Sequence, residues 1–196
     1  MLISIEGNIG TGKTTLLKSL QNNKYKSVYE PVDEWGDWLN LFYKDKRNAF
    51  GFNMKILHSY QSKLKDENII SERSPFTSKE IFYKLALKEK FSSYCEYNLY
   101  CDYYDLLARI PDYFIYIQTD PEVCLERIKN RNRKEEENIS LEYLKELHKY
   151  HENVYNPKNF IVGRGSPIKN KNIIIIDGNQ NRFGVLNDVR KAVNLI

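Results

Sequence analysis

Residues Gly7 to Thr14 match the pattern G-x-x-x-x-G-K-[ST], whose chemistry is phosphate binding. Glycines tolerate positive φ, so a glycine-rich turn lets successive backbone N–H groups surround an anion. A helix that starts near Lys13 would direct the positive end of its dipole at the same point. The Lys13 ammonium can reach the outer phosphates, and the Thr14 hydroxyl can ligate Mg²⁺. The motif predicts binding of a nucleoside triphosphate and leaves the acceptor open.

Glu30, Glu72 and Arg73 stand at the ends of two expected strands, Ser27–Glu30 and Asn68–Glu72. Open α/β sheets bind ligands at the carboxyl ends of their strands. A strand-end carboxylate is commonly just solvated, but both of these strands follow the phosphate-binding loop. We therefore expect the three side chains to face the same crevice as the loop.

Aromatic residues are dense between positions 35 and 60 and could form a slot for a flat ring. A nucleobase gains about 1–3 kcal/mol from stacking on each aromatic face. Spacing alone supports a base-binding slot and an ordinary core equally. The residues are Trp35, Trp38, Phe42, Tyr43, Phe50, Phe52 and Tyr60.

Arg127, Arg131 and Arg133 end an expected helix over Pro121–Asn132, and acidic residues follow. A charge run is usually a solvated face. However, Arg127 and Arg131 lie four apart on one helical face, and arginine is the preferred clamp for phosphoryl oxygens in a closing lid. We expect an arginine-rich lid over about residues 127–140.

Strands alternate with helices along the whole chain, which predicts one α/β domain, residues 1–196, with a five-stranded parallel sheet and helices on both faces. The remaining expected strands are Leu2–Glu6, Tyr113–Gln118 and Ile173–Asp177, the last an unbroken apolar run typical of a fully buried strand. The other expected helices are Lys13–Asn22, two pieces of 36–66 broken near Lys44–Asn48, Thr77–Lys88, Ser93–Ala108, Leu141–Tyr155 and Asn181–Asn194, with a loop over Asn156–Asn172.

The 196 residues are 41% hydrophobic and 29% charged with a net charge of +4, an ordinary globular composition. The mild basic excess suits anionic ligands, but no Lys/Arg block resembles a nucleic-acid-binding tail and no apolar run has membrane length. We expect no targeting peptide, because the first expected strand starts at Leu2. Three cysteines are too few for a disulfide framework or a zinc site, which favours the cytoplasm. Cys124 is expected in the core, and His148 and His151 on a helix surface.

Several separated motifs together resemble the deoxynucleoside kinase family, which includes deoxycytidine, deoxyguanosine and mitochondrial-type thymidine kinases. They span nearly the whole chain: Ile5 to Thr15, Glu30-Pro31-Val32-x-x-Trp35, Glu72-Arg73-Ser74, Pro121 to Ile128, Arg131-x-Arg133-x-Glu135-Glu136, and Leu141 to Glu152. The resemblance implies a P-loop kinase fold and phosphorylation of a deoxynucleoside 5′-hydroxyl by ATP with Mg²⁺. It also implies a homodimer, with the helices near Thr77–Lys88 and Ser93–Ala108 as the candidate interface.

The resemblance also implies residue roles. Glu30 matches the general base, Arg73 the arginine at the 5′-oxygen, and Glu72 with Thr14 the Mg²⁺ ligands. Arg127, Arg131 and Arg133 match lid arginines, with Arg131 also stacking on the ATP base. ATP would be bound by Gly7, Asn8, Ile9, Gly10, Thr11, Gly12, Lys13, Thr14, Thr15, Arg131 and Arg133. Lys13 and Arg127 join Glu30 and Arg73 as catalytic residues. The nucleoside would be bound by Glu30, Trp35, Phe42, Tyr43, Phe52, Asn53, Tyr60, Arg73, Ser78, Phe82 and Glu136, with Tyr43 and Glu136 on the sugar 3′-hydroxyl.

Three positions depart from the family pattern. Asn53 replaces a glutamine that pairs with the base edge, so the amide is one methylene shorter. Ser78 stands where cytidine and guanosine kinases carry Asp and thymidine-type enzymes carry Ala. Tyr60 stands where the cytidine and guanosine kinases carry Arg and the thymidine-type insect enzyme carries Met. Without the Asp/Arg pair, the slot favours thymidine or mixed pyrimidine deoxynucleosides.

Three alternatives compete with this interpretation. Thymidylate kinase shares the phosphate loop and a Glu-Pro after the second strand, but here Val32-x-x-Trp35 follows, and Glu72-Arg73-Ser74 differs from its usual motif. A GTPase-like switch would need an Asn-Lys-x-Asp signature, which the chain lacks. A relative that only binds nucleotides is disfavoured, since every catalytic position is filled.

Overall fold

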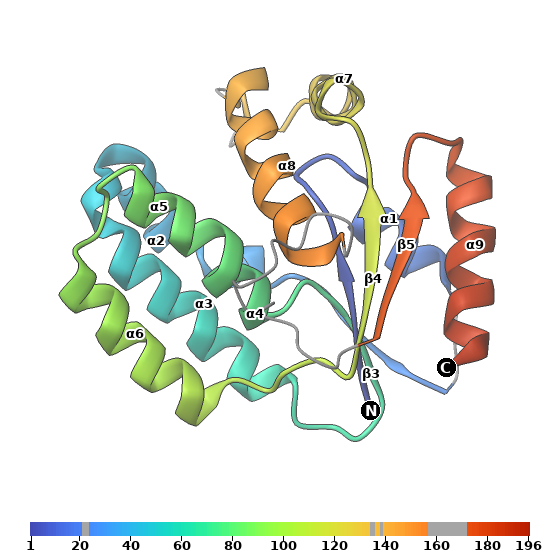
Figure 1. The fold of residues 1–196 in the computed structure, drawn as a ribbon, viewed down its shortest axis with the longest axis horizontal. Helices are drawn as coiled ribbons and strands as arrows, with labels where there is room; N and C mark the ends of the chain where they lie inside the picture. Colours follow the sequence, from blue (N-terminus) through green and yellow to red (C-terminus); the bar gives the residue numbers. More distant parts are fainter. Residues whose placement is uncertain (21–23, 134–135, 138, 157–171) are drawn as a thin grey trace.

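The structure, a computed structural model, describes residues 1–20, 24–133, 136–137, 139–156 and 172–196. Within these ranges a parallel five-stranded sheet has the order β2-β3-β1-β4-β5. The strands are β1 (Leu2–Glu6), β2 (Lys26–Val28), β3 (Ile69–Glu72), β4 (Tyr113–Gln118) and β5 (Asn172–Asp177) (Figure 1). The predicted α/β fold is confirmed. Because β1 has β3 on one side and β4 on the other, its carboxyl end is the switch point where such sheets bind ligands.

Helices cover both faces of this sheet. On one face, α1 and α9 pack with Ile3 and Ile5 of β1. On the other face, α8 and the helical stretch after β3 pack with Phe114 and Tyr116 of β4. The helices are α1 (Lys13–Leu20), α2 (Gly36–Lys44), α3 (Ala49–Lys63), α4 (Pro75–Thr77), η3 (Ser78–Tyr83), α5 (Lys84–Lys88), α6 (Tyr94–Leu107), α7 (Pro121–Arg131), α8 (Leu141–Tyr155) and α9 (Arg182–Leu195), with short turns η1 (Val32–Glu34) and η2 (Lys46–Asn48). No helix in the described ranges is long and apolar enough to cross a membrane.

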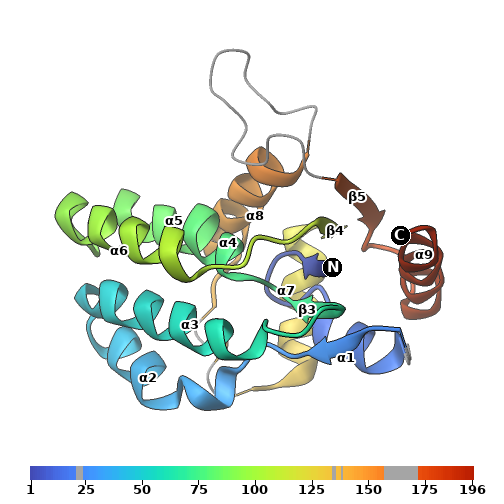
Figure 2. The ribbon, with the colours of Figure 1, turned by 90° about the horizontal axis from the view of Figure 1, so that it is seen from below.

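A second layer of helices lies beside the sheet, where α3 packs against both α2 and α6 (Figures 1 and 2). Its core joins Leu57 of α3 to Tyr83, Tyr100 and Tyr104. This layer connects β2 to β3 and β3 to β4. It therefore brings the aromatic residues of α2 and α3 to the ligand-binding edge of the sheet.

Local signals explain where several helices start and stop. Ser93 and Glu96 form a reciprocal capping box at the start of α6. Pro121 occupies the first turn of α7, and Asn132 ends that helix in the left-handed conformation. The Asn181 side chain accepts a hydrogen bond from the Gly184 N–H at the start of α9.

Some element bounds differ from the predictions. β2 ends at Val28, so Glu30 lies two residues beyond the strand rather than within it. The helix expected from Thr77 starts at Pro75 and passes through a π-helical segment, Ser78–Tyr83. The end of the helix expected to reach Asn22 lies outside the described residues, as do positions 134, 135 and 138 of the expected lid and residues 157–171 of the expected loop.

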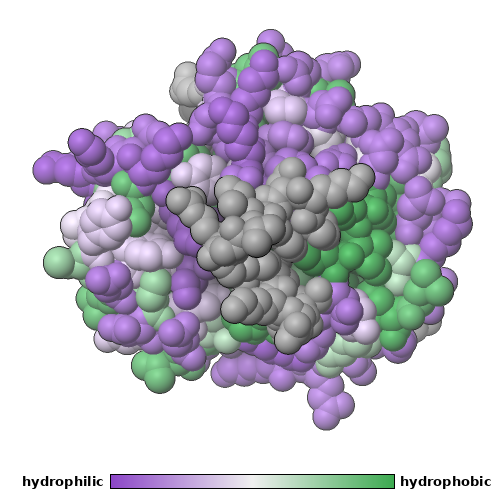
Figure 3. All heavy atoms as spheres, viewed as in Figure 1, coloured by the Kyte–Doolittle hydropathy of each residue, from purple (hydrophilic) through white to green (hydrophobic). Residues whose placement is uncertain are grey.

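Two burial predictions were wrong. β5 is an edge strand rather than a fully buried one, and Ile175 is 39% exposed. Figure 3 shows apolar atoms over β5 beside α9. His151 is fully buried rather than on a helix surface, because its side of α8 packs on β4 and its ring stacks on Tyr116 at 6.1 Å. Cys124 is buried, as predicted.

Candidate active site

The phosphate-binding loop runs from the end of β1 into α1. Gly7, Gly10 and Gly12 all have positive φ, at 149°, 85° and 91°. At Gly10 a Cβ atom would lie 2.5 Å from the Cys124 carbonyl oxygen of α7, so glycine is needed both for conformation and for close approach. The Asn8 amide donates to the Leu144 carbonyl oxygen at 2.9 Å, which ties the loop to α8.

The Lys13 side chain is folded into the loop. It is 5% exposed, and its Nζ donates to the carbonyl oxygens of Gly7 at 3.0 Å and Asn8 at 2.7 Å. Burial and the nearby Arg73 charge lower the Lys13 pKa to about 8, against the opposing effect of three carboxylates. Lys13 thus remains mostly protonated at neutral pH and can meet an anion.

Thr14 and Glu72 come together from α1 and β3. The Thr14 hydroxyl donates to Glu72 Oε1 at 2.6 Å. A hydroxyl and a carboxylate oxygen side by side next to a phosphate loop are hard ligands of the kind Mg²⁺ accepts from protein, the remaining positions being filled by phosphate and water. The residues present therefore fit ATP with Mg²⁺.

Glu30 and Arg73 form an ion pair beside this position. Glu30 Oε1 lies 3.2 Å from Arg73 Nε, and the Arg73 side chain is almost fully buried. The guanidinium also stacks over the Phe82 ring at 4.8 Å. Burial raises the pKa of Glu30, and the Arg73 charge partly opposes that rise. A carboxylate with a raised pKa next to a fixed cation can accept a proton from a hydroxyl group.

The aromatic residues of α2 and α3 pack together at this edge of the sheet. The Phe52 ring meets Trp35 edge-on at 6.0 Å and stacks on Phe42 at 5.4 Å. Trp35 and Tyr60 are buried, whereas Phe42 and Phe52 are half-buried. Tyr60 donates its hydroxyl to the Glu72 carbonyl oxygen at 2.8 Å. The aromatic group is thus partly core and partly a half-buried surface, and the ring against Arg73 is that of Phe82.

Asn53 and Ser78 are both buried. The Asn53 Nδ2 donates to the Ala49 carbonyl oxygen at 2.8 Å, which fixes the amide orientation because a carbonyl can only accept. The Asn53 Oδ1 has no hydrogen-bond partner among the described residues. The amide therefore offers the unpaired Oδ1 as an acceptor, and one of its two N–H groups is already used within α3.

The arginines of α7 make two different sets of contacts. Arg127 donates to the Gly178 carbonyl oxygen at 3.0 Å and lies 3.5 Å from that of Thr11, so it joins the loop after β5 to the phosphate-binding loop. Arg131 pairs with Glu136 at 2.6 Å and Arg133 lies 3.8 Å from the same carboxylate. These contacts place Arg127 at the phosphate-binding loop and join Arg131 and Arg133 to Glu136.

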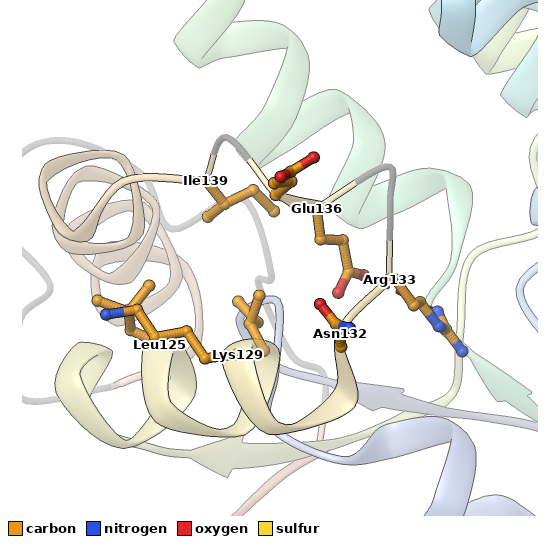
Figure 4. Close-up of a pocket in the computed structure, with 8 residues that line it drawn as sticks. Leu125, Lys129, Asn132, Arg133, Glu136 and Ile139 are labelled. Atoms are coloured by element: carbon orange, nitrogen blue, oxygen red, sulfur yellow. Dashed lines mark ion pairs between the residues drawn. The ribbon is translucent and has the colours of Figure 1, made fainter.

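A cavity of about 250 Å³ lies between α7 and the residues Glu136, Glu137 and Ile139 that follow it, with Arg133 and Glu136 at one end (Figure 4). Leu125 and Lys129 of α7 face Ile139 across it. Tyr43 of α2 is 46% exposed, and the Lys46 ammonium lies over its ring at 4.6 Å.

Glu6 and His151 are among the buried polar residues that were assigned no role from the sequence. Glu6 ends β1 and is fully buried, and His151 is buried against β4. The signal for Glu6 was an acidic residue at the end of an otherwise largely apolar strand. No comparable signal marked His151, because its polar neighbours on α8 suggest a solvated face.

Known proteins share this architecture. The sequence model described as deoxynucleoside kinase matches residues 3–194. Putative kinase protein 143R of Invertebrate iridescent virus 6 is 37% identical over 98% of this chain and 96% of its own length. Deoxycytidine kinase of Homo sapiens is 32% identical over 76% of this chain and 73% of its own. The structure of deoxyadenosine kinase from M. mycoides, with dCMP and dCDP bound, superposes with a TM-score of 0.83 at 27% identity, over 100% of this chain and 99% of that one.

Proposed function

The chain belongs to the deoxynucleoside kinase family, and we propose that it transfers the terminal phosphoryl group of ATP to the 5′-hydroxyl of thymidine or of several pyrimidine deoxynucleosides, with Mg²⁺. The observation that carries this proposal is the convergence of two pairs, formed by residues from the start of α1, the segment after β2 and the end of β3. Thr14 lies against Glu72, and Glu30 lies against Arg73. A site for a metal-bound triphosphate thus adjoins a base able to activate a hydroxyl group.

Each group has a defined task in this reaction. The loop amides and Lys13 bind the phosphates, and Thr14 with Glu72 would hold Mg²⁺, which when bound neutralises charge on the phosphate oxygens. Glu30 orients the 5′-hydroxyl and accepts its proton. Arg73 stabilises negative charge on the transferred group.

Lid residues complete the proposal. Arg127, Arg131 and Arg133 bind the donor, and Tyr43 with Glu136 hold the sugar 3′-hydroxyl. The contact of Arg127 with the Thr11 carbonyl oxygen of the phosphate-binding loop supports the role of this arginine.

The base preference is supported by the uncharged lining of the slot. Positions 60 and 78 carry Tyr and Ser, and the Tyr60 hydroxyl already donates to the Glu72 carbonyl oxygen. Asn53 offers its Oδ1 as an acceptor, which suits a ring N–H such as thymine N3–H or the exocyclic amino group of cytosine. A pyrimidine fits a slot narrowed by the bulky Tyr60 ring.

We propose a homodimer through α6. Tyr100 and Tyr104 of this helix belong to the core, but Leu99, Tyr103 and Leu106, which share one helical face, are 46%, 44% and 79% exposed. These side chains form the apolar face expected of a subunit interface. Sedimentation equilibrium tests this, and a monomer at micromolar concentration would contradict it. A cytoplasmic location also stays a prediction.

Transfer of radiolabelled phosphate from ATP to the four deoxynucleosides and to thymidine monophosphate tests the function. We expect labelled monophosphates from thymidine or deoxycytidine and none from purine deoxynucleosides. Labelling of thymidine monophosphate alone would favour the alternative, a thymidylate kinase. Omission of Mg²⁺ should abolish transfer.

A further inference from the structure

Glu6 is a buried carboxylate that the proposed reaction does not use. It is the last residue of β1 and is 0% exposed. Its Oε1 accepts hydrogen bonds from the Ser4 hydroxyl at 2.6 Å and the Ser74 hydroxyl at 3.0 Å. Its Oε2 has no hydrogen-bond partner in the part of the chain that the structure describes.

The surroundings of Glu6 are largely apolar, so stability of the fold gives no reason for a negatively charged side chain at this position. In register with it stands Tyr116 of β4, on the sheet face where aromatic and aliphatic side chains of α8 pack. Burial raises the pKa of Glu6. Burying a carboxylate with half of its acceptor capacity unused is costly, so a neutral residue of the same size would suit the fold as well or better.

The contact with Ser74 connects Glu6 to the corner that carries Arg73. Arg73 has a positive φ of 59°, an unfavourable conformation for a non-glycine residue that persists only where its surroundings impose it. Here the Arg73 N–H donates to the Ile5 carbonyl oxygen at 3.0 Å, and the next residue, Ser74, donates to Glu6. The end of β1 thus holds the corner by one backbone bond and one carboxylate.

Glu6 and Arg73 also interact through their charges. The Arg73 guanidinium lowers the pKa of Glu6, opposing the effect of burial, and Glu6 in turn is second only to Glu30 among the charges that favour the protonated Arg73. Arg73 is 5% exposed, so solvent screens these charges little. A buried cation that is attracted by two carboxylates has less freedom to follow either one.

We propose that Glu6 is a positioning residue, which fixes the Glu72–Ser74 corner and supplies a second counter-charge to Arg73, so that the guanidinium stays beside Glu30. The inference rests on the proposed function, because Arg73 is the catalytic group through which Glu6 acts. Glu6 itself touches neither substrate.

The test is Glu6→Gln, which keeps the hydrogen-bonding oxygen and removes the charge. We expect kcat to fall about 10- to 100-fold, because small displacements of a catalytic group have effects of this size, with nucleoside and ATP KM nearly unchanged. The melting temperature should stay the same or rise, which a merely structural role would not produce. Glu80→Gln, a buried carboxylate paired with Lys84 away from Arg73, is the matched control and should keep wild-type kcat.

A double-mutant cycle identifies the route of the effect. In an Arg73→Ala background, Glu6→Gln should change kcat by less than about twofold, because a residue that acts through Arg73 has nothing left to position. Full additivity, or wild-type kcat in Glu6→Gln, overturns the inference. Should Glu6→Gln not fold, Ser74→Ala keeps the charge and must still lower kcat. Inactivity of the wild-type chain on every deoxynucleoside would instead reject the proposed function.

Discussion

Replacing Glu30 by glutamine removes the negative charge of the proposed base and keeps the shape of its side chain. Loss of a general base typically lowers the rate by about 10²–10⁴-fold, which is about 2.7–5.5 kcal/mol of transition-state stabilisation. Glu30 Oε1 lies 3.2 Å from Arg73 Nε, and a glutamine side chain of the same length fits the same position. We therefore expect kcat to fall by this factor and the nucleoside KM to change much less.

Steady-state kinetics over a pH series make the test specific. A base acts only when deprotonated, so the wild-type rate falls as the pH falls through the Glu30 pKa, which burial places above its ordinary value of 4.5. The Glu30→Gln variant should lack this acidic limb. Glu34→Gln is the control, since Glu34 lies in the next turn, partly exposed and paired with Lys63 at 2.7 Å. Near-normal turnover in Glu30→Gln, or the same acidic limb, would refute the reasoning.

Three further substitutions test the other parts of the site. Lys13→Ala should abolish phosphate transfer from ATP, because it removes the loop's buried ammonium, and retained transfer would contradict the phosphate-loop assignment. Glu72→Gln should raise the Mg²⁺ concentration needed for half-maximal activity, and an unchanged Mg²⁺ titration would exclude Glu72 as a ligand. Asn53→Ala should weaken nucleoside binding by about 1–3 kcal/mol, the cost of leaving a base donor unpaired, without changing the ATP KM; calorimetric titration with the nucleoside measures this.

The sequence was a good guide to the sheet and a weaker one to burial. β1 and β4 have the predicted bounds. Loop residues and the change from the periodicity of a strand to that of a helix mark the ends of such a strand in the local sequence. Burial of β5 could not be read in this way. Its run of isoleucines is that of a central strand, but its place at the edge depends on the pairing order β1-β4-β5, which no local pattern contains.

The same distinction applies to the site. The phosphate loop and Thr14 could be predicted from a contiguous motif. Glu30, Glu72 and Arg73 could be predicted at one edge of the sheet because each lies at or near the carboxyl end of a strand. Contacts that depend on tertiary packing were out of reach. The Asn53 amide turning back to its own helix is one example, and the carboxylate of Glu6 behind Arg73 is another.

The Arg131–Glu136 ion pair joins two residues to which the family resemblance assigns different ligands. Arg131 is expected on the ATP base and Glu136 on the sugar hydroxyl, yet they lie 2.6 Å apart. The Arg131 side chain is 31% exposed, and an ion pair of this kind typically contributes about 0.2–1 kcal/mol. Stacking of a base on a planar side chain contributes about 1–3 kcal/mol. Binding of both substrates can therefore separate the pair, so the contact is compatible with both expected roles.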